Sequence, residues 1–123
     1  MERKFDLDER LINFASAITD IAESLPKTVA GKYVSEQLIR CGVAPALQYA
    51  EAQAAESRAD FSHKMKISLK ELRETYNCLK LINKKSWIDA EILNLQMSEN
   101  NQLIAIFFKS IETAKKNSIL KKS

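Results

Sequence analysis

Glycine, proline and histidine are scarce in this sequence. Its 123 residues include two glycines, two prolines and one histidine. An all-β domain of this length needs many turns, and Gly and Pro are the residues that turns use most. Two glycines also cannot build a phosphate-binding loop of the G-x-G-x-x-G kind. The composition therefore excludes an all-β domain and the glycine-dependent nucleotide folds, and it favours an all-α domain.

Long apolar runs are also missing. The longest, Leu103–Phe108, has six residues, whereas a membrane-spanning helix needs about 18. The first ten residues mix both charges without an apolar core, which is not typical of a secretory signal. The two cysteines, Cys41 and Cys78, do not make a disulfide framework. We expect a cytoplasmic protein with reduced thiols and no membrane association.

Apolar residues recur at steps of three and four along most of the chain, which is the helical period. Asp6, Thr28, Ser57 and Ser86 are suited to cap helix starts. The pattern predicts helices over residues 7–25, 28–56, 58–83 and 87–116. Because the connections are short, we expect an antiparallel, up-down-up-down four-helix bundle. It forms a single domain, 1–123, with a frayed basic tail at 117–123.

Three details of these helices can be predicted. Pro45 lies inside the second helix and should kink or open it, because proline has no N–H and its ring crowds the preceding turn; Gly42 should add slack there. The segment 98–101, Ser-Glu-Asn-Asn, has weak helix propensity, so the fourth helix is expected to break there. Six apolar residues of that helix are expected in the core: Ile88, Ile92, Leu95, Leu103, Ile106 and Phe107.

Catalytic and metal-binding patterns are not found. A di-iron site in a bundle needs two Glu-x-x-His pairs, whereas His63 is the sole histidine and no Glu stands three residues before it. Cys41 falls on the core side of its helix without a neighbouring base. We therefore expect no cofactor, no metal and no enzymatic activity.

Four charged residues are predicted to pair between the second and third helices: Arg40, Glu51, Glu71 and Glu74. Their spacing places them on the flanks of these two helices, beside the apolar positions. The alternative is a carboxylate cluster for catalysis or metal binding. We favour interhelical ion pairs that fix how the two helices align.

The third helix carries the clearest surface signal. Residues 64–85 hold seven Lys or Arg against two Glu, although the net charge of the chain is only +3. Five of the cations, together with Asn77, recur at helical spacing and predict one row about 25–30 Å long: Lys66, Lys70, Arg73, Lys80 and Lys84. Lys109 and Lys116 extend the candidate contact. Such a row can follow a phosphate backbone; the alternative is an ordinary solvated face.

Several apolar residues fall outside the predicted core stripes, most clearly Ile104, Phe108 and Ile111 on the fourth helix. A small bundle cannot bury apolar residues all around a helix. They are candidates for a homo-oligomer interface. The alternative is scattered surface apolarity, which is normal.

Two adjoining helices also carry a family resemblance. Its residues are the strings Leu38–Val43, Ala50–Ala52, Ser57–Lys66, Ser68–Thr75 and Leu79–Ile82. Together they resemble the four-helix-bundle proteins encoded in intervening sequences of bacterial large-subunit ribosomal RNA genes, a family that includes the accessory variability proteins of diversity-generating retroelements. The resemblance implies a non-enzymatic bundle. It also implies, from the retroelement members, a pentamer that engages nucleic acid and a reverse transcriptase.

These observations lead to two functional hypotheses. The first is a self-associating accessory protein that binds the backbone of a structured RNA or a DNA through the cation row. The second is a protein-interaction or scaffold module that binds a protein partner, with lysines that only keep it soluble. Few aromatic residues interleave the lysines, so any nucleic-acid contact should depend on shape and charge rather than on base stacking.

Overall fold

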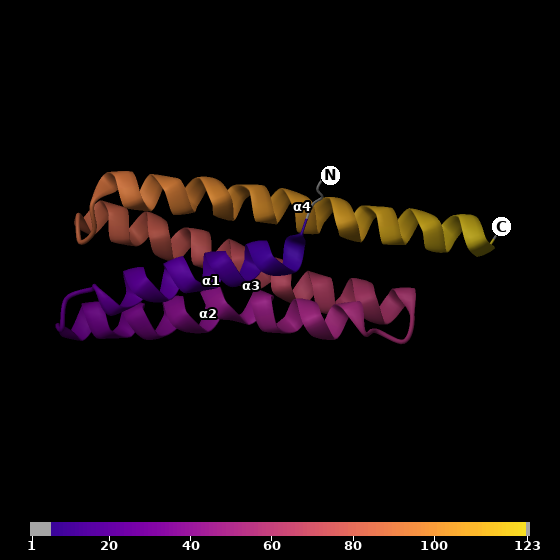
Figure 1. Cartoon of the computed structure of the whole chain (residues 1–123), viewed down its shortest axis with the longest axis horizontal. Helices are drawn as coiled ribbons and strands as arrows, with labels where there is room; N and C mark the ends of the chain where they lie inside the picture. The colour runs from indigo at the N-terminus through magenta and orange to yellow at the C-terminus, as the bar shows by residue number, and fades with distance from the viewer. Residues whose placement is uncertain (1–5, 123) are drawn as a thin grey trace.

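Four helices follow one another in antiparallel order in the computed structural model (Figure 1). The structure describes the backbone of residues 6–122 and the side chains of residues 6–117. The helices are α1 (Leu7–Glu23), α2 (Val29–Gln53), α3 (Arg58–Lys85) and α4 (Ala90–Lys122). Within that described part there is no β-strand. The predicted four-helix bundle is confirmed.

Side-chain caps begin the first three helices, as the sequence predicts. Asp6 accepts a hydrogen bond from the Glu9 N–H at 3.1 Å. The Thr28 hydroxyl accepts one from Gly31 at 3.0 Å, and the Ser57 hydroxyl one from Asp60 at 3.0 Å. Each of these bonds satisfies an N–H group that has no partner within its helix.

Ser86 has a different role from the one predicted. It ends α3 instead of starting α4, and its backbone adopts a left-handed conformation with φ 56° and ψ 36°. The Ser86 N–H donates to the Asn83 carbonyl at 3.1 Å, and the Trp87 N–H donates to the Ile82 carbonyl at 3.3 Å. These bonds close the last turn of α3, so α4 begins only at Ala90.

The predicted break in α4 is wrong. The helix continues through 98–101 because Asn100 is fully buried and its side-chain amide bonds the backbone of α3. Its nitrogen donates to the Leu72 carbonyl at 3.0 Å, and its oxygen accepts from the Tyr76 N–H at 3.1 Å. The helix also continues through 117–122, while Ser123 lies outside the described residues. Fraying of this tail stays a prediction.

The helix α2 is continuous through Pro45. Gly42, which was expected to loosen this helix, instead makes room for α1. A Cβ atom at Gly42 would stand 2.5 Å from Cγ2 of Ile18. The two helices are therefore packed more closely here than any larger residue would allow.

The helix α1 is only 17 residues long, against 33 for α4. It starts near the middle of the bundle and covers one half of it (Figure 1). It packs closely on α2 but contacts α4 much less. The bundle therefore has an open seam between α1 and α4, which we call the α1–α4 seam.

This seam explains why two of the six residues expected in the core of α4 are exposed. Ile92 is 50% exposed and Leu95 is 68% exposed, because they lie on the side of α4 where coverage by α1 is thin. Ile88 and Ile106 are partly buried, and Leu103 and Phe107 are fully buried. The other buried residues of α4 are Leu93, Asn100 and Ile111.

Candidate nucleic-acid interface

The cation row on α3 is exposed along its whole length. Lys66, Lys70, Arg73, Asn77, Lys80 and Lys84 are all solvent-exposed. At 1.5 Å per residue the row extends about 27 Å along the helix. The buried side of α3 carries other residues, among them Met65, Leu72 and Leu79. The structure thus exposes every member of the row along one side of α3.

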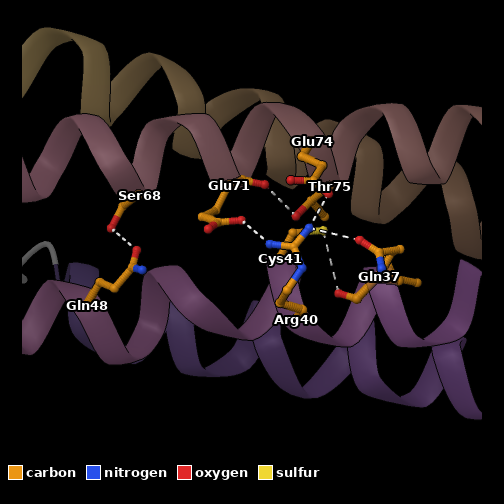
Figure 2. Close-up of polar contacts among 9 residues, drawn as sticks. Gln37, Arg40, Cys41, Gln48, Ser68, Glu71, Glu74 and Thr75 are labelled. Atoms are coloured by element: carbon orange, nitrogen blue, oxygen red, sulfur yellow. Dashed lines mark hydrogen bonds and ion pairs between the residues drawn. The ribbon is translucent and has the colours of Figure 1, made fainter.

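The two carboxylates of the same stretch point away from this row and toward α2. Arg40 donates from Nη1 to Oε1 of Glu71 at 3.0 Å and from Nη2 to Oε2 of Glu74 (Figure 2). Gln37 also accepts from Arg40, at 3.0 Å. Arg40 offsets one of the two negative charges, and both carboxylates are turned toward it rather than toward the row, which reduces their effect on the positive potential there.

The ion pairs align α2 with α3, as does a partly buried polar contact about two turns away along α2. There the Ser68 hydroxyl donates to Oε1 of Gln48 at 2.8 Å (Figure 2). Glu51, predicted in the same network, is exposed and takes no part in the ion pairs among the described side chains. It lies three turns along α2 from Arg40, beyond the reach of that guanidinium.

Lys64 belongs to a separate pair. Its ammonium donates to Oδ1 of Asp60 at 2.6 Å. This hydrogen bond lowers the pKa of Asp60 and raises the pKa of Lys64. Lys64 is thus held at the start of α3 and adds little to the row.

Lys109 and Lys116 stand on α4 and are exposed, but Lys109 does not continue the α3 row. It lines a hollow of about 650 Å³ at the end of the bundle where α2 turns into α3. Phe61 and Ile106 also line this hollow, with Arg58. Of the described residues of α1, none lines it, because α1 does not reach this half (Figure 1). Lys116 lies two helical turns beyond Lys109 on the same side of α4.

The candidate interface residues on α4 separate in the structure. Phe108 is 52% exposed, Ile104 packs partly against the core, and Ile111 is buried at 6% exposure. The prediction that Ile111 lies outside the core is wrong. It is directed inward because Leu103, Phe107 and Ile111 follow one another at steps of four residues. They therefore lie on the same side of α4, the side that faces the core.

The α1–α4 seam is an apolar surface that the sequence pattern did not reveal. Two hollows of about 330 and 280 Å³ lie along it, and Leu95 lines the first while Ile92 lines the second. Across the seam, Arg10 donates to both carboxylate oxygens of Glu99 at 2.7 and 2.8 Å, and to Oε1 of Gln102 at 2.7 Å. In the sequence, Ile92 and Leu95 stand out only as apolar residues at helical spacing, a pattern that predicts core positions rather than surface.

The described residues contain no group of three or more His, Cys, Asp or Glu that could hold a metal ion. Among the same residues, no helix is both long and apolar enough to cross a bilayer. His63 is exposed on the first turns of α3. Cys41 is buried, Cys78 is partly buried, and both are free thiols.

The fold and surface define a small all-α bundle protein with one strongly basic helix face. A family model places it more closely: residues 3–109 match the 23S rRNA-intervening sequence protein family. The chain belongs to this family. The resemblance found in the α2 and α3 strings is thereby confirmed.

One solved structure is similar over most of both chains. It is the crystal structure of a protein of unknown function from the S23 ribosomal protein family of Bacteroides thetaiotaomicron. It shares 26% identity with this chain at a TM-score of 0.80, and the match covers 86% of this chain and 98% of the other. No curated protein matches the sequence. Neither the family description nor this structure's description assigns a reaction.

Proposed function

We propose that this protein is a non-enzymatic, self-associating accessory protein that binds the backbone of a structured RNA or a duplex DNA. The observation that carries this proposal is the cation row on α3. Five cations stand along about 27 Å of one helix face, and the carboxylates of that stretch are turned aside and paired with Arg40. A phosphate backbone presents charges at a comparable scale.

The α3 row favours recognition by shape and charge. Its members are Lys, Arg and Asn, which bond phosphate oxygens readily and need no particular base sequence. Base stacking would require exposed aromatic rings between the cations. Tyr76, the aromatic residue nearest the centre of the row, is partly buried instead.

The test is fluorescence anisotropy of a labelled RNA hairpin and a labelled DNA duplex, titrated with the protein at several salt concentrations. Each neutralised phosphate contributes about −0.9 to the log–log slope for duplex DNA. Five contacts would therefore give a slope of about −4.5. The Lys66→Glu/Lys70→Glu variant should lose most of the affinity.

A matched control carries the same change in net charge elsewhere. The control is Lys27→Glu/Lys32→Glu, since both lysines are exposed near the α1–α2 connection. This variant should keep most of its affinity and its steep salt dependence. Equal losses of affinity in the two variants would mean that binding depends only on net charge, and would exclude the α3 row as the binding site.

A second function is supported by a separate observation, the α1–α4 seam. Its exposed Ile92 and Leu95 suit a contact with another protein chain. If neither nucleic acid binds even at low salt, the protein is a protein-interaction module and the seam is its contact surface.

A further inference from the structure

The two cysteines of the chain meet between α2 and α3. Cys41 is fully buried on α2 and Cys78 is partly buried on α3. The Cys41 thiol donates to the Leu38 carbonyl at 3.8 Å and lies beside Thr75 of α3 (Figure 2). Cys78 follows Thr75 by three residues, on the same side of α3, and the two thiols are close enough for each to shift the pKa of the other. Figure 2 shows the Cys41 side chain pointing toward α3. The chain has no other cysteine, so each thiol has one possible partner within the molecule.

We propose that Cys41 and Cys78 are an oxidisable dithiol, which a hydroperoxide such as hydrogen peroxide converts into a disulfide that joins α2 to α3. Both thiols are free in the structure. In a reducing compartment such a disulfide is a transient, redox-sensing modification rather than a permanent structural bond. The inference does not depend on nucleic-acid binding.

The surroundings give the two sulfurs different roles. The hydrogen bond with Cys41 lowers the pKa of Cys78, and the nearby Arg40 charge acts in the same direction, against burial and the Glu74 charge. The same hydrogen bond, together with burial, raises the pKa of Cys41. The thiolate is the reactive form of cysteine, and Cys78 is also the more accessible sulfur. Cys78 therefore reacts first and Cys41 resolves.

The reaction balances with one peroxide. The Cys78 thiolate attacks one peroxide oxygen, the O–O bond breaks, and the leaving hydroxide takes up a proton to become water. The Cys41 sulfur then attacks the sulfur of the Cys78 sulfenic acid; the S–O bond breaks, and the Cys41 proton leaves with the hydroxyl as a second water. Two thiols lose two electrons in total, and hydrogen peroxide gains them.

The backbone beside Cys41 can follow the movement that bond formation needs. A disulfide brings its sulfurs to about 2.05 Å, which is closer than a hydrogen-bonded contact of two thiols. Pro45 has no N–H, so the helical hydrogen bond that would hold the Cys41 carbonyl is missing. A small shift of this turn toward α3 therefore breaks no hydrogen bond between the Cys41 carbonyl and residue 45.

The test treats the reduced, full-length protein with hydrogen peroxide, then unfolds it, alkylates it with iodoacetamide and measures its intact mass. The expected product is a monomer that has lost two hydrogens and takes up no alkyl group. Peptide mapping should show the Cys41 and Cys78 peptides linked, and dithiothreitol should restore both alkylation sites.

Two single variants separate the roles of the sulfurs. In Cys41→Ala, Cys78 has no resolving partner, so its sulfenic acid should persist and be trapped by dimedone. In Cys78→Ala, the buried Cys41 should stay unmodified at the same peroxide dose. The proposal is overturned if both wild-type thiols remain alkylatable, if the disulfide links two chains, or if Cys78 is oxidised to a sulfinic acid while Cys41 stays free.

Discussion

Asn100 shows how one polar side chain can hold two helices in register. It is fully buried on α4, and both ends of its amide bond the α3 backbone, at Leu72 and Tyr76. A buried amide loses its bonds to water, so it is tolerated in a core only where the protein replaces them. The position of Asn100 along α4 is therefore fixed relative to one turn of α3.

Replacing Asn100 with alanine should destabilise the bundle. The variant loses two interhelical hydrogen bonds and leaves a small void, which together cost about 1–3 kcal/mol. Urea unfolding followed by circular dichroism should show a lower midpoint with an unchanged slope. Asn101→Ala is the matched control, because the Asn101 side chain is exposed although it neighbours Asn100 in the sequence. This variant should shift the midpoint little. Equal midpoints for the two variants would contradict the role of Asn100.

At the scale of the element, α2 owes its close contact with α1 to Gly42. The nearest atoms to a Cβ at this position belong to the branched end of Ile18, at 2.5 Å and 3.2 Å. Ile is β-branched and stiff at χ1, so its methyl group cannot easily swing aside. The absence of a side chain at Gly42 is thus a packing requirement, although glycine weakens the helix itself.

Gly42→Ala should therefore lower the free energy of unfolding, even though alanine has the higher helix propensity. Alanine contributes about 1 kcal/mol in propensity, but overpacking against Ile18 costs about 1–3 kcal/mol and displaces α1. The measurement is urea unfolding of the variant in the wild-type and Ile18→Ala backgrounds. In the second background, where the clash is absent, the same substitution should be neutral or stabilising. A stabilised Gly42→Ala in the wild-type background would contradict this packing.

Individual elements also show which features a sequence alone can predict. The caps Asp6, Thr28 and Ser57 could be predicted because capping depends on residues three positions apart. The α3 row could also be predicted, because all its residues belong to one helix and their spacing alone places them on one side of it. The continuity of α4 could not, because the weak propensity of its middle is overridden by bonds from Asn100 to another helix.

At the scale of the whole molecule, the packing of α4 on α3 decides which side of α4 is buried. Ile111 lies on the same side of α4 as the buried Leu103 and Phe107, whereas Ile92 and Leu95 lie on another side and are exposed. Periodicity shows which residues form an apolar stripe but not which stripe a neighbouring helix will cover. The sequence therefore could not identify the α1–α4 seam as surface.

The seam leads to a prediction about self-association. We expect multi-angle light scattering to give a mass that is a multiple of the 14.0 kDa chain, and Leu95→Lys to shift it toward the monomer. Leu47→Lys on α2 is a matched control, since Leu47 is 63% exposed and Leu95 is 68% exposed. Phe108→Lys tests the other candidate surface in the same way. A wild-type protein that is strictly monomeric at all concentrations would contradict self-association.

The order of contacts has a consequence for how the chain folds. Helices that are adjacent in the sequence make most of the contacts between helices, so most of the core forms between segments that are close along the chain. Such low contact order is typical of bundles that fold in microseconds to milliseconds. The Arg10–Glu99 bond across the seam joins residues 89 positions apart. On the ribosome, α1, α2 and α3 can therefore pack as they emerge, and the ion pair between Arg10 and Glu99 forms last.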